Sequence, residues 1–361
     1  MVRSTRHGSL FPTIRKLHAW SGLCLSLVLA ILSLSGVLLI FKDDYLAARF
    51  PEVRDVADTA PESLGSAIES FERKFSQQRL SYVLLPRPGF GLYRIVLRNG
   101  EAAYAVSSGE VVERWSGNAR IEDWLFDLHH YLLMGEFGEY LAGLVALIAV
   151  VMAVTGVYLF LPFRRRFDWR LWPASMRRRD ILAYHRNAGV VFALPIFVIL
   201  LTGGAMVFYS QASALMSVLT VSKASPFEQP TAQPGDVDWQ KALSAAKTRF
   251  PDASPRLVIW PRSDNAAAVI RLRQAGEWHQ NGRSVVYLNP EDSGVLAVRD
   301  ATTLSRGERA SNAIYPIHST GIGGRIYDLV AAVSGITLTA LALLASWTYL
   351  SVLRSRKGRS I

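Results

Sequence analysis

KLHAWSGL, residues 16–23, stands where the chain enters its first long apolar stretch, and it places Gly22 four residues after His18. AYHRNAGV, residues 183–190, repeats this arrangement with His185 and Gly189 ahead of another apolar stretch. Ionisable side chains at membrane depth are costly, so an imidazole at the mouth of an apolar helix indicates a functional site. Two such histidines in register predict one shared function.

The composition indicates a membrane protein. Half of the 361 residues are hydrophobic and the mean hydropathy is +0.19, which is too apolar for an ordinary soluble enzyme. A helix needs roughly 20 apolar residues to cross a hydrocarbon core of about 30 Å. Four segments meet this length: residues 17–41, 139–161, 184–209 and 326–350. The first is too long for a cleaved signal peptide and lacks a small-residue cleavage site.

The net charge of +11 is concentrated in short connections, which argues against a nucleic-acid-binding role. Basic clusters precede the first span (Arg3, Arg6, Arg15, Lys16), fill residues 164–179 and end the chain as RSRKGR, residues 354–359. The positive-inside rule puts all three in the cytoplasm. The prediction is a cytoplasmic N-terminus with the first span (1–41), an external domain (42–138), the second span (139–161), a basic cytoplasmic loop (162–183), the third span (184–209), a second external domain (210–325), and the fourth span with a basic cytoplasmic C-terminus (326–361).

The chain contains an internal duplication. A shift of 167 residues (185 − 18) puts His18 on His185 and Gly22 on Gly189, and it also aligns Ser35 with Thr202 and Gly36 with Gly203. With another offset, WLFDLHH at 124–130 matches AIYPIHS at 313–319, so that His129 aligns with His318. Each external segment has the pattern of one helix followed by three alternating strands. Function in such repeats commonly lies where the two halves meet.

LHAWSG (17–22), LFDLHH (125–130), YHRNAG (184–189) and YPIHSTGIGG (315–324) carry a resemblance to a known family. The chain resembles the PepSY-associated transmembrane family of iron-regulated inner-membrane proteins over nearly its whole length, and the helix-plus-strands units resemble PepSY domains. The resemblance implies a membrane α-helical bundle of four transmembrane helices with two periplasmic α+β PepSY-like domains. It also implies a siderophore-iron reductase that carries b-type haem.

The histidines fit such a cofactor. Haem b takes two axial nitrogen donors, here from different helices at matching depth. His18 and His185 form one candidate pair of haem-iron ligands near the cytoplasmic face, and His129 and His318 form another near the outer face. Pairing by helix rather than by repeat remains an alternative. Adjacent helical residues point about 100° apart, so His130 is assigned a hydrogen-bonding role near a haem or the substrate.

Other residues near these histidines have two interpretations. Gly22 and Gly189 lie on the same helix face as their histidines and leave room for a macrocycle, or they allow close helix packing. Arg15, Lys16, Arg186 and Arg325 are placed to pair with haem propionates, or they form an ordinary basic collar at the membrane surface. Cys24 is the single cysteine, which excludes a CxxC motif and an iron–sulfur cluster; it is assigned to packing. His7 and His279 are assigned no chemistry.

No dinucleotide fingerprint, Walker lysine motif, HExxH or nucleophile elbow occurs in the sequence. Electrons would therefore come from membrane quinol or a cytoplasmic reductase, and the family resemblance proposes an external ferric siderophore as acceptor. A cleft between the external domains is the expected binding site, with six candidate aromatic walls: Trp115, Trp124, Tyr131, Tyr209, Trp260 and Tyr315. Two rival functions are a PepSY protein that binds peptides or restrains proteases, and a cytochrome that serves another periplasmic acceptor.

Overall fold

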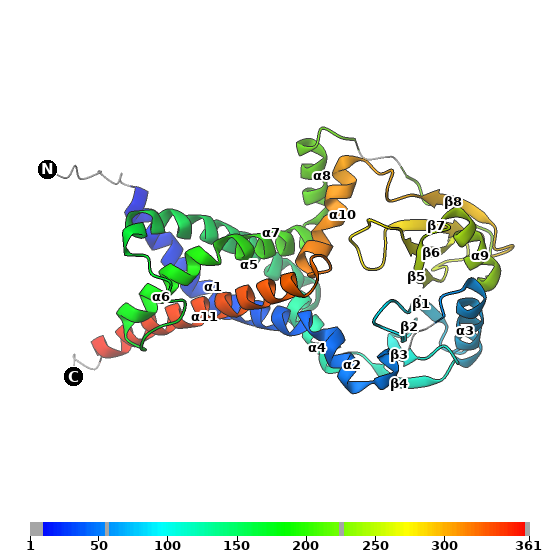
Figure 1. Cartoon of the computed structure of the whole chain (residues 1–361), viewed down its shortest axis with the longest axis horizontal. Helices are drawn as coiled ribbons and strands as arrows, with labels where there is room; N and C mark the ends of the chain where they lie inside the picture. The colour runs from blue at the N-terminus through cyan, green and yellow to red at the C-terminus, as the bar shows by residue number, and fades with distance from the viewer. Residues whose placement is uncertain (1–9, 55–57, 224–226, 358–361) are drawn as a thin grey trace. The chain divides into compact units, whose positions relative to one another are not determined.

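The computed structural model describes residues 10–54, 58–223 and 227–357, so Arg3, Arg6 and His7 lie outside the described residues. The chain forms two compact units, and both halves of the sequence contribute to each. A helical unit comprises Met1–Ile40, Leu125–Tyr209 and Ile317–Ile361, and a sheet unit comprises Phe41–Trp124 and Ser210–Pro316. Figure 1 shows the elements of both units along the chain.

The helical unit is built from long apolar helices that pack in crossed pairs. Its elements are α1 (Leu10–Ile40), the end of α4 (Ile121–Tyr131), α5 (Gly135–Phe160), the 3-10 turn η2 (Leu161–Arg166), α6 (Arg178–Val191), α7 (Ala193–Val207) and α11 (Gly324–Lys357). Helix α1 packs against α11, and α5 packs against α7. A hydroxyl contact of 2.7 Å between Ser33 and Thr339 joins α1 to α11. Each half therefore contributes one helix to each of these two pairs.

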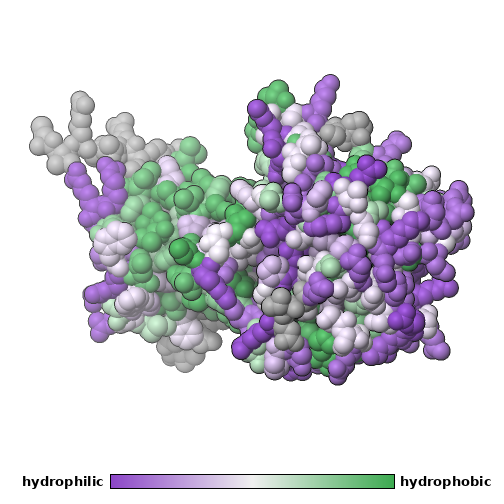
Figure 2. Space-filling view, turned by 45° about the vertical axis from the view of Figure 1, so that its right-hand side comes forward, coloured by the Kyte–Doolittle hydropathy of each residue, from purple (hydrophilic) through white to green (hydrophobic). Residues whose placement is uncertain are grey.

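Among the described residues, three helices are long and apolar enough to cross a membrane, within Leu10–Ile40, Gly135–Arg166 and Gly324–Tyr349. The third predicted span is not one straight helix: α6 and α7 meet at an angle of 71° and make a fourth crossing only if the bent pair counts as one span. Pro195 lies in the first turn of α7. Because proline has no amide hydrogen and clashes with the carbonyl four residues before it, the helix breaks here. Figure 2 shows hydrophobic side chains gathered over these helices.

The sheet unit contains eight antiparallel strands in the order β4-β3-β2-β1-β5-β6-β7-β8. The strands are β1 (Leu80–Leu84), β2 (Tyr93–Leu97), β3 (Glu101–Ala105), β4 (Val111–Ser116), β5 (Ser254–Ile259), β6 (Ala268–Arg273), β7 (Ser284–Leu288) and β8 (Val295–Arg299). The helical segments are α2 (Lys42–Arg49), the 3-10 turn η1 (Pro51–Arg54), α3 (Pro61–Lys74), α8 (Tyr209–Leu219), α9 (Trp239–Arg249) and α10 (Arg306–His318).

Two features predicted for residues 42–138 and 210–325 were wrong: three strands in each segment, and a separate sheet for each. Each half supplies four strands rather than three, because residues 93–105 form a hairpin of β2 and β3. Strands β1 and β5 then pair antiparallel, with Val83 opposite Val258, and join the two halves into one sheet. An unpaired edge exposes a row of backbone hydrogen-bonding groups. The matched apolar edges of the two repeats satisfy each other's backbone groups.

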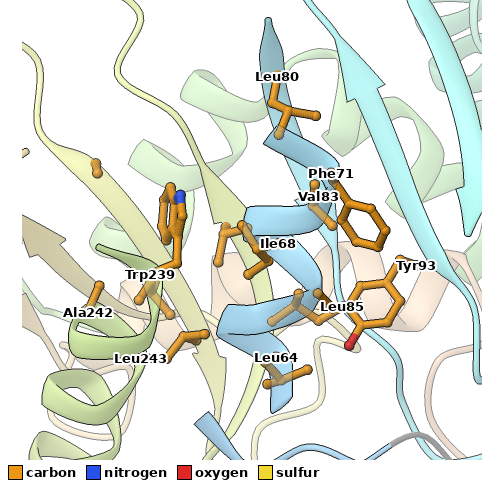
Figure 3. Packing of buried hydrophobic residues seen from close by; sticks show 14 of the residues in the cluster. Leu64, Ile68, Phe71, Leu80, Val83, Leu85, Tyr93, Trp239, Ala242 and Leu243 are labelled. Carbon is orange, nitrogen blue, oxygen red and sulfur yellow. The ribbon is translucent and has the colours of Figure 1, made fainter. Parts of the chain in front are cut away.

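A single apolar core lies between the sheet and helices α3 and α9, which pack against each other. Ile68 and Phe71 on α3 and Trp239 and Leu243 on α9 are fully buried there (Figure 3). The carboxylate of Glu72 accepts hydrogen bonds from the indoles of Trp239 (3.0 Å) and Trp260 (2.7 Å). Burial raises the pKa of Glu72 in spite of these two donors. The hydrogen bonds cross from the first half to the second.

Two of the six aromatic residues predicted to line a cleft between two domains have other roles. Trp260 packs against the shared core, and Trp115 is buried in a second cluster with Leu46, Phe50 and Tyr104. The indole of Trp115 donates a hydrogen bond of 2.6 Å to Asp123. These two tryptophans are interior residues, because the halves meet through a continuous sheet and one core.

Candidate functional site

The structure brings together His18 and His185, the histidines at which the internal repeat is clearest. The imidazole rings of His18 on α1 and His185 on α6 lie with their centroids 6.3 Å apart and their planes perpendicular, at 90°. This is the first pair. Its members come from different halves and from different helices, as the repeat alignment predicted.

The second pair consists of His129 on α4 and His318 on α10, whose ring centroids are 6.0 Å apart at an interplanar angle of 30°. Burial lowers the pKa of His129 to about 4 and also lowers the pKa of His318. Both imidazoles are therefore neutral near pH 7. A neutral imidazole is the form that binds a metal.

The two histidines of the second pair are held in equivalent ways. Nδ1 of His129 lies 2.9 Å from the backbone carbonyl of Leu32, and Nδ1 of His318 lies 3.1 Å from that of Ile199. The carbonyl can only accept, so Nδ1 carries the hydrogen in both rings. Nε2 is then left with its lone pair, which is the tautomer that a metal ligand requires.

Glycines allow the two histidine rings to approach these backbone carbonyls. A Cβ added at Gly36 would lie 2.8 Å from Cε1 of His129, and one at Gly203 would lie 2.9 Å from Cε1 of His318. Each glycine is four residues after the carbonyl that its histidine reaches, so it lies on the same side of the helix. The hydroxyls of Ser35 and Thr202, 3.2 Å from the respective Nδ1 atoms, complete the matching environments.

The first pair is less symmetric. Nδ1 of His18 lies 3.0 Å from Oγ1 of Thr155, whose own hydroxyl donates to the carbonyl of Met152, so the threonine accepts from Nδ1 and leaves Nε2 free. His185 lies beside the Leu341 carbonyl. Its buried Nδ1 makes no hydrogen bond with the residues that the structure describes.

His130 does not join the second pair. Its ring stacks on Phe126 on the same helix, with centroids 5.3 Å apart and an interplanar angle of 16°. Its Nδ1 points towards Glu139, whose carboxylate oxygen is 3.9 Å away. His129 and His130 thus face different neighbours, as their positions on one helix require.

The two glycines predicted beside the first pair have different surroundings. A Cβ at Gly22 would meet Cε of Met152 at 3.2 Å, which is a helix-packing contact, whereas a Cβ at Gly189 would meet no atom within 4 Å among the described residues. Gly156 is the glycine closest to His18, because its added Cβ would lie 3.4 Å from Cε1. Of the two predicted glycines, Gly189 is therefore the one that leaves open space beside it.

The cations predicted near the histidines are mostly engaged elsewhere. Arg186 donates to the side chain of Asn187 and to the backbone carbonyl of Arg166, each at 3.0 Å. Arg325 is mainly exposed and lies 3.8 Å from Asp328. Arg15 and Lys16 are exposed on the first turns of α1. Arg186 is thus half-buried and the other three are exposed, and their pairing with haem propionates stays a prediction.

The spacing within each pair suits one metal ion held between two imidazoles. Two metal–nitrogen bonds of about 2 Å each, together with the two ring radii, span about 6 Å. Groups of three or more histidine, cysteine or carboxylate side chains that could hold a metal ion do not occur among the described residues. Two protein ligands leave four positions of an octahedral ion unfilled, and a planar macrocycle with four nitrogens fills four positions.

Comparison with known families shows to which family the chain belongs. A model of the PepSY-associated TM region matches residues 15–351, which is almost the entire chain. The protein belongs to this family. The match includes all four paired histidines and both four-stranded halves of the sheet. No curated protein matches the sequence.

Within this PepSY-associated protein, the sequence indicated the four histidines but not what holds them. The carbonyls of Leu32 and Ile199 are backbone groups and leave no trace in residue type. The repeat did contain a signal, because it aligned Ser35 with Thr202 and Gly36 with Gly203, the residues that contact the second pair. Thr155 and Gly156 were missed because their contact with His18 joins helices far apart in the chain.

Proposed function

We propose that this protein is a b-type cytochrome of the bacterial inner membrane that passes electrons across the bilayer and reduces a ferric siderophore on the outer side. The observation that supports the proposal is the pairing of four repeat-related histidines, with ring separations of 6.3 and 6.0 Å. A structural role would explain one such contact. It would not explain two such contacts, each of which joins repeat-equivalent histidines from the two halves.

Each pair would hold one haem b through Nε2. His18 and His185 are the proposed ligands of one haem, and His129 and His318 of the other. The hydrogen bonds of His18, His129 and His318 fix their tautomers and ring orientations, as outer-shell partners of metal ligands do. Bound haem supplies a one-electron carrier that cycles between Fe(III) and Fe(II).

The two pairs lie at different levels of the helical unit. His18 is near the start of α1, and His129 contacts the same helix at Leu32, 14 residues later (32 − 18). At 1.5 Å per residue this is about 21 Å along the helix axis. Two carriers at these levels would span most of a hydrocarbon core of about 30 Å.

The basic loops place the first pair on the cytoplasmic side in this proposal, with both termini in the cytoplasm. One electron from membrane quinol or a cytoplasmic reductase enters there, and one electron leaves to an Fe(III) chelate outside. The chelated iron is reduced to Fe(II). Hard oxygen ligands such as hydroxamates hold Fe(II) less tightly than Fe(III), so reduction releases the iron.

The first test is to purify the full chain in detergent after expression with ample haem, record a reduced-minus-oxidised absorption spectrum and quantify haem per chain. We expect two b-type haems. The dithionite-reduced protein, freed of excess reductant, should then be reoxidised anaerobically by a ferric siderophore. A folded protein that contains no haem would overturn the proposal and favour a PepSY protein that binds peptides or restrains proteases. Haem that only another periplasmic acceptor reoxidises would retain the cytochrome and overturn the siderophore assignment.

Gly203→Ala should weaken haem binding at the second pair about 10- to 100-fold, which is the usual effect of disturbing a partner of a metal ligand. The added Cβ would lie 2.9 Å from the His318 ring and push it off the Ile199 carbonyl. Leu201→Ala is the control, because Leu201 lies on the same helix two residues before Gly203 and its side chain is 42% exposed. Haem per chain after gel filtration measures both variants. Equal haem in the two would contradict the arrangement of the second pair.

A further inference from the structure

One face of the second half of the sheet carries an unusual set of arginines. In strand β6, Ala268, Ile270 and Leu272 face the shared core, so the alternate residues Arg271 and Arg273 lie on the opposite face. Arg256 lies on β5 between Ser254 and Leu257, which pair with Arg273 and Arg271 respectively. We call Arg256, Arg271 and Arg273 the arginine cluster.

The fold does not require these arginines, because the first half of the sheet does without two of them. Val83 pairs with Ile95, and its counterpart Val258 pairs with Ile270, so the repeats align with an offset of 175 (270 − 95). Arg271 then corresponds to Val96 and Arg256 to Ser81. Only Arg273 has an arginine counterpart, Arg98.

The contrast extends across neighbouring strands. In the first half, Val96, Ala102 and Trp115 lie side by side in an apolar row. The corresponding row in the second half is Arg271, Val285 and Arg299. One repeat therefore packs this row as a core, and the other presents guanidinium groups.

The cover over the row differs as well. In the first half, α2 and η1, which follow the first span, pack Leu46, Phe50 and Val53 onto the apolar face. In the second half, α8 follows the third span, but it lies against α10, where Ser213 contacts Ser311 at 3.1 Å. Arg271 and Arg273 remain partly exposed as a result.

Little negative charge accompanies the cluster: Glu277 acts electrostatically on Arg271, but its carboxylate accepts hydrogen bonds from the backbone amides of Gln274 and Arg283. Arg256 is only 5% exposed, and the Nε atoms of Arg256 and Arg271 are buried and without a hydrogen-bond partner in the described parts of the chain. No carboxylate among the described residues forms an ion pair with any of the three. Their other bonds go to backbone carbonyls: Arg256 to Pro86 and Arg273 to Glu277, each at 3.1 Å.

The pKa values of groups in and beside the cluster reflect this uncompensated charge. Burial, with further contributions from Arg273 and Arg87, lowers the pKa of the Arg256 guanidinium to about 10. His279, which stacks on Tyr315, has its pKa lowered to about 3 by burial and then by Arg283, Arg271 and Arg273. The arginines themselves stay protonated at pH 7. Buried charges in proteins are normally paired, so a bound anion would relieve this arrangement.

We propose that the arginine cluster is a binding site for a carboxylate-bearing ferric chelate. The planar fork of arginine binds carboxylates in bidentate fashion. The identity of the metal rests on the proposed function, whereas the charge and carboxylate chemistry of the ligand rest on the cluster alone. The substrate class is therefore anionic polycarboxylate chelates of Fe(III), in preference to neutral or cationic hydroxamate chelates.

Isothermal titration calorimetry of the oxidised full-length protein with gallium(III) citrate tests the site without electron transfer, because gallium(III) is not reduced under these conditions. We expect Arg271→Val, which installs the residue of the first repeat, and Arg273→Gln each to weaken binding at least tenfold. Arg249→Gln, exposed at the end of α9, should bind as the wild type does. Circular dichroism checks that each variant keeps its sheet.

Wild-type binding that both cluster variants lose and the control retains would support the proposal. No binding of gallium(III) citrate, or binding unchanged in both cluster variants, would overturn it. Equal competition by inorganic phosphate or by a neutral gallium hydroxamate would overturn the substrate class. A protein that binds gallium(III) citrate but lacks haem would support the carboxylate site and refute the cytochrome function. A haem protein that ferric chelates reoxidise but that does not bind gallium(III) citrate would support the cytochrome function and refute the carboxylate site.

Discussion

His318→Ala should reduce the haem content from two per chain to about one and abolish reduction of external ferric chelates. Loss of an axial nitrogen affects metal binding more than loss of an outer-shell partner, which already costs 10- to 100-fold, so we expect the rate of chelate reduction to fall at least about 100-fold. Haem per chain and stopped-flow reoxidation of the reduced protein measure the two effects. The first pair should keep its haem, because its ligands lie elsewhere on α1 and α6.

His130→Ala is the matched control for this experiment. His130 is a histidine next to His129, yet it stacks on Phe126 and its Nδ1 points towards Glu139. It should retain two haems, while His129→Ala should behave like His318→Ala. Loss of haem in His130→Ala but not in His129→Ala would show that the second pair has been misassigned.

Trp239→Ala should destabilise the sheet unit by about 3–5 kcal/mol, the usual cost of removing a buried aromatic side chain. The Trp239 side chain is fully buried between α9 and the sheet, and its indole contacts that of Trp260 in a tilted arrangement, with centroids 4.6 Å apart. Its removal also deprives Glu72 of one of two hydrogen-bond donors. Urea unfolding of the detergent-solubilised protein, followed by the β-sheet signal in circular dichroism, measures the change.

Trp278→Ala is the control for the same chemical change at a solvent-exposed position. Its side chain is 52% exposed and lies in a connection of the same unit. Surface substitutions usually change stability by no more than about 0.5 kcal/mol. If Trp239→Ala unfolded at the same urea concentration as Trp278→Ala, the shared core of the two halves would not be the main source of stability.

The anion site shows how an internal repeat can separate scaffold from function. Positions at which both halves carry apolar residues, such as Ile95 and Ile270, define the common core. Positions at which the halves differ in charge, such as Val96 and Arg271, are free to serve a ligand. The same comparison applied to the histidines gives the opposite result, since their positions are matched in both halves and the proposed function uses both.

The sequence by itself predicted the membrane character, the duplication and which histidines form the two pairs. These features depend on local patterns: apolar length fixes a spanning helix, and register between repeats shows that His18 corresponds to His185 and His129 to His318. Helix periodicity also separated His129 from His130. Such properties need only neighbouring residues along the chain, so they could be predicted without knowledge of the fold.

Only the tertiary structure decided how the halves combine. Residues 80–84 and 254–259 each read as an ordinary strand, and nothing in either segment specifies that they pair to make one sheet in place of two domains. The break at Phe192 follows from Pro195, but the 71° angle depends on packing. The carbonyls that orient the second pair belong to the backbone of distant helices, where any residue type offers the same oxygen. Contacts between backbone groups far apart in sequence leave no mark on composition or spacing, and for that reason the structure alone revealed them.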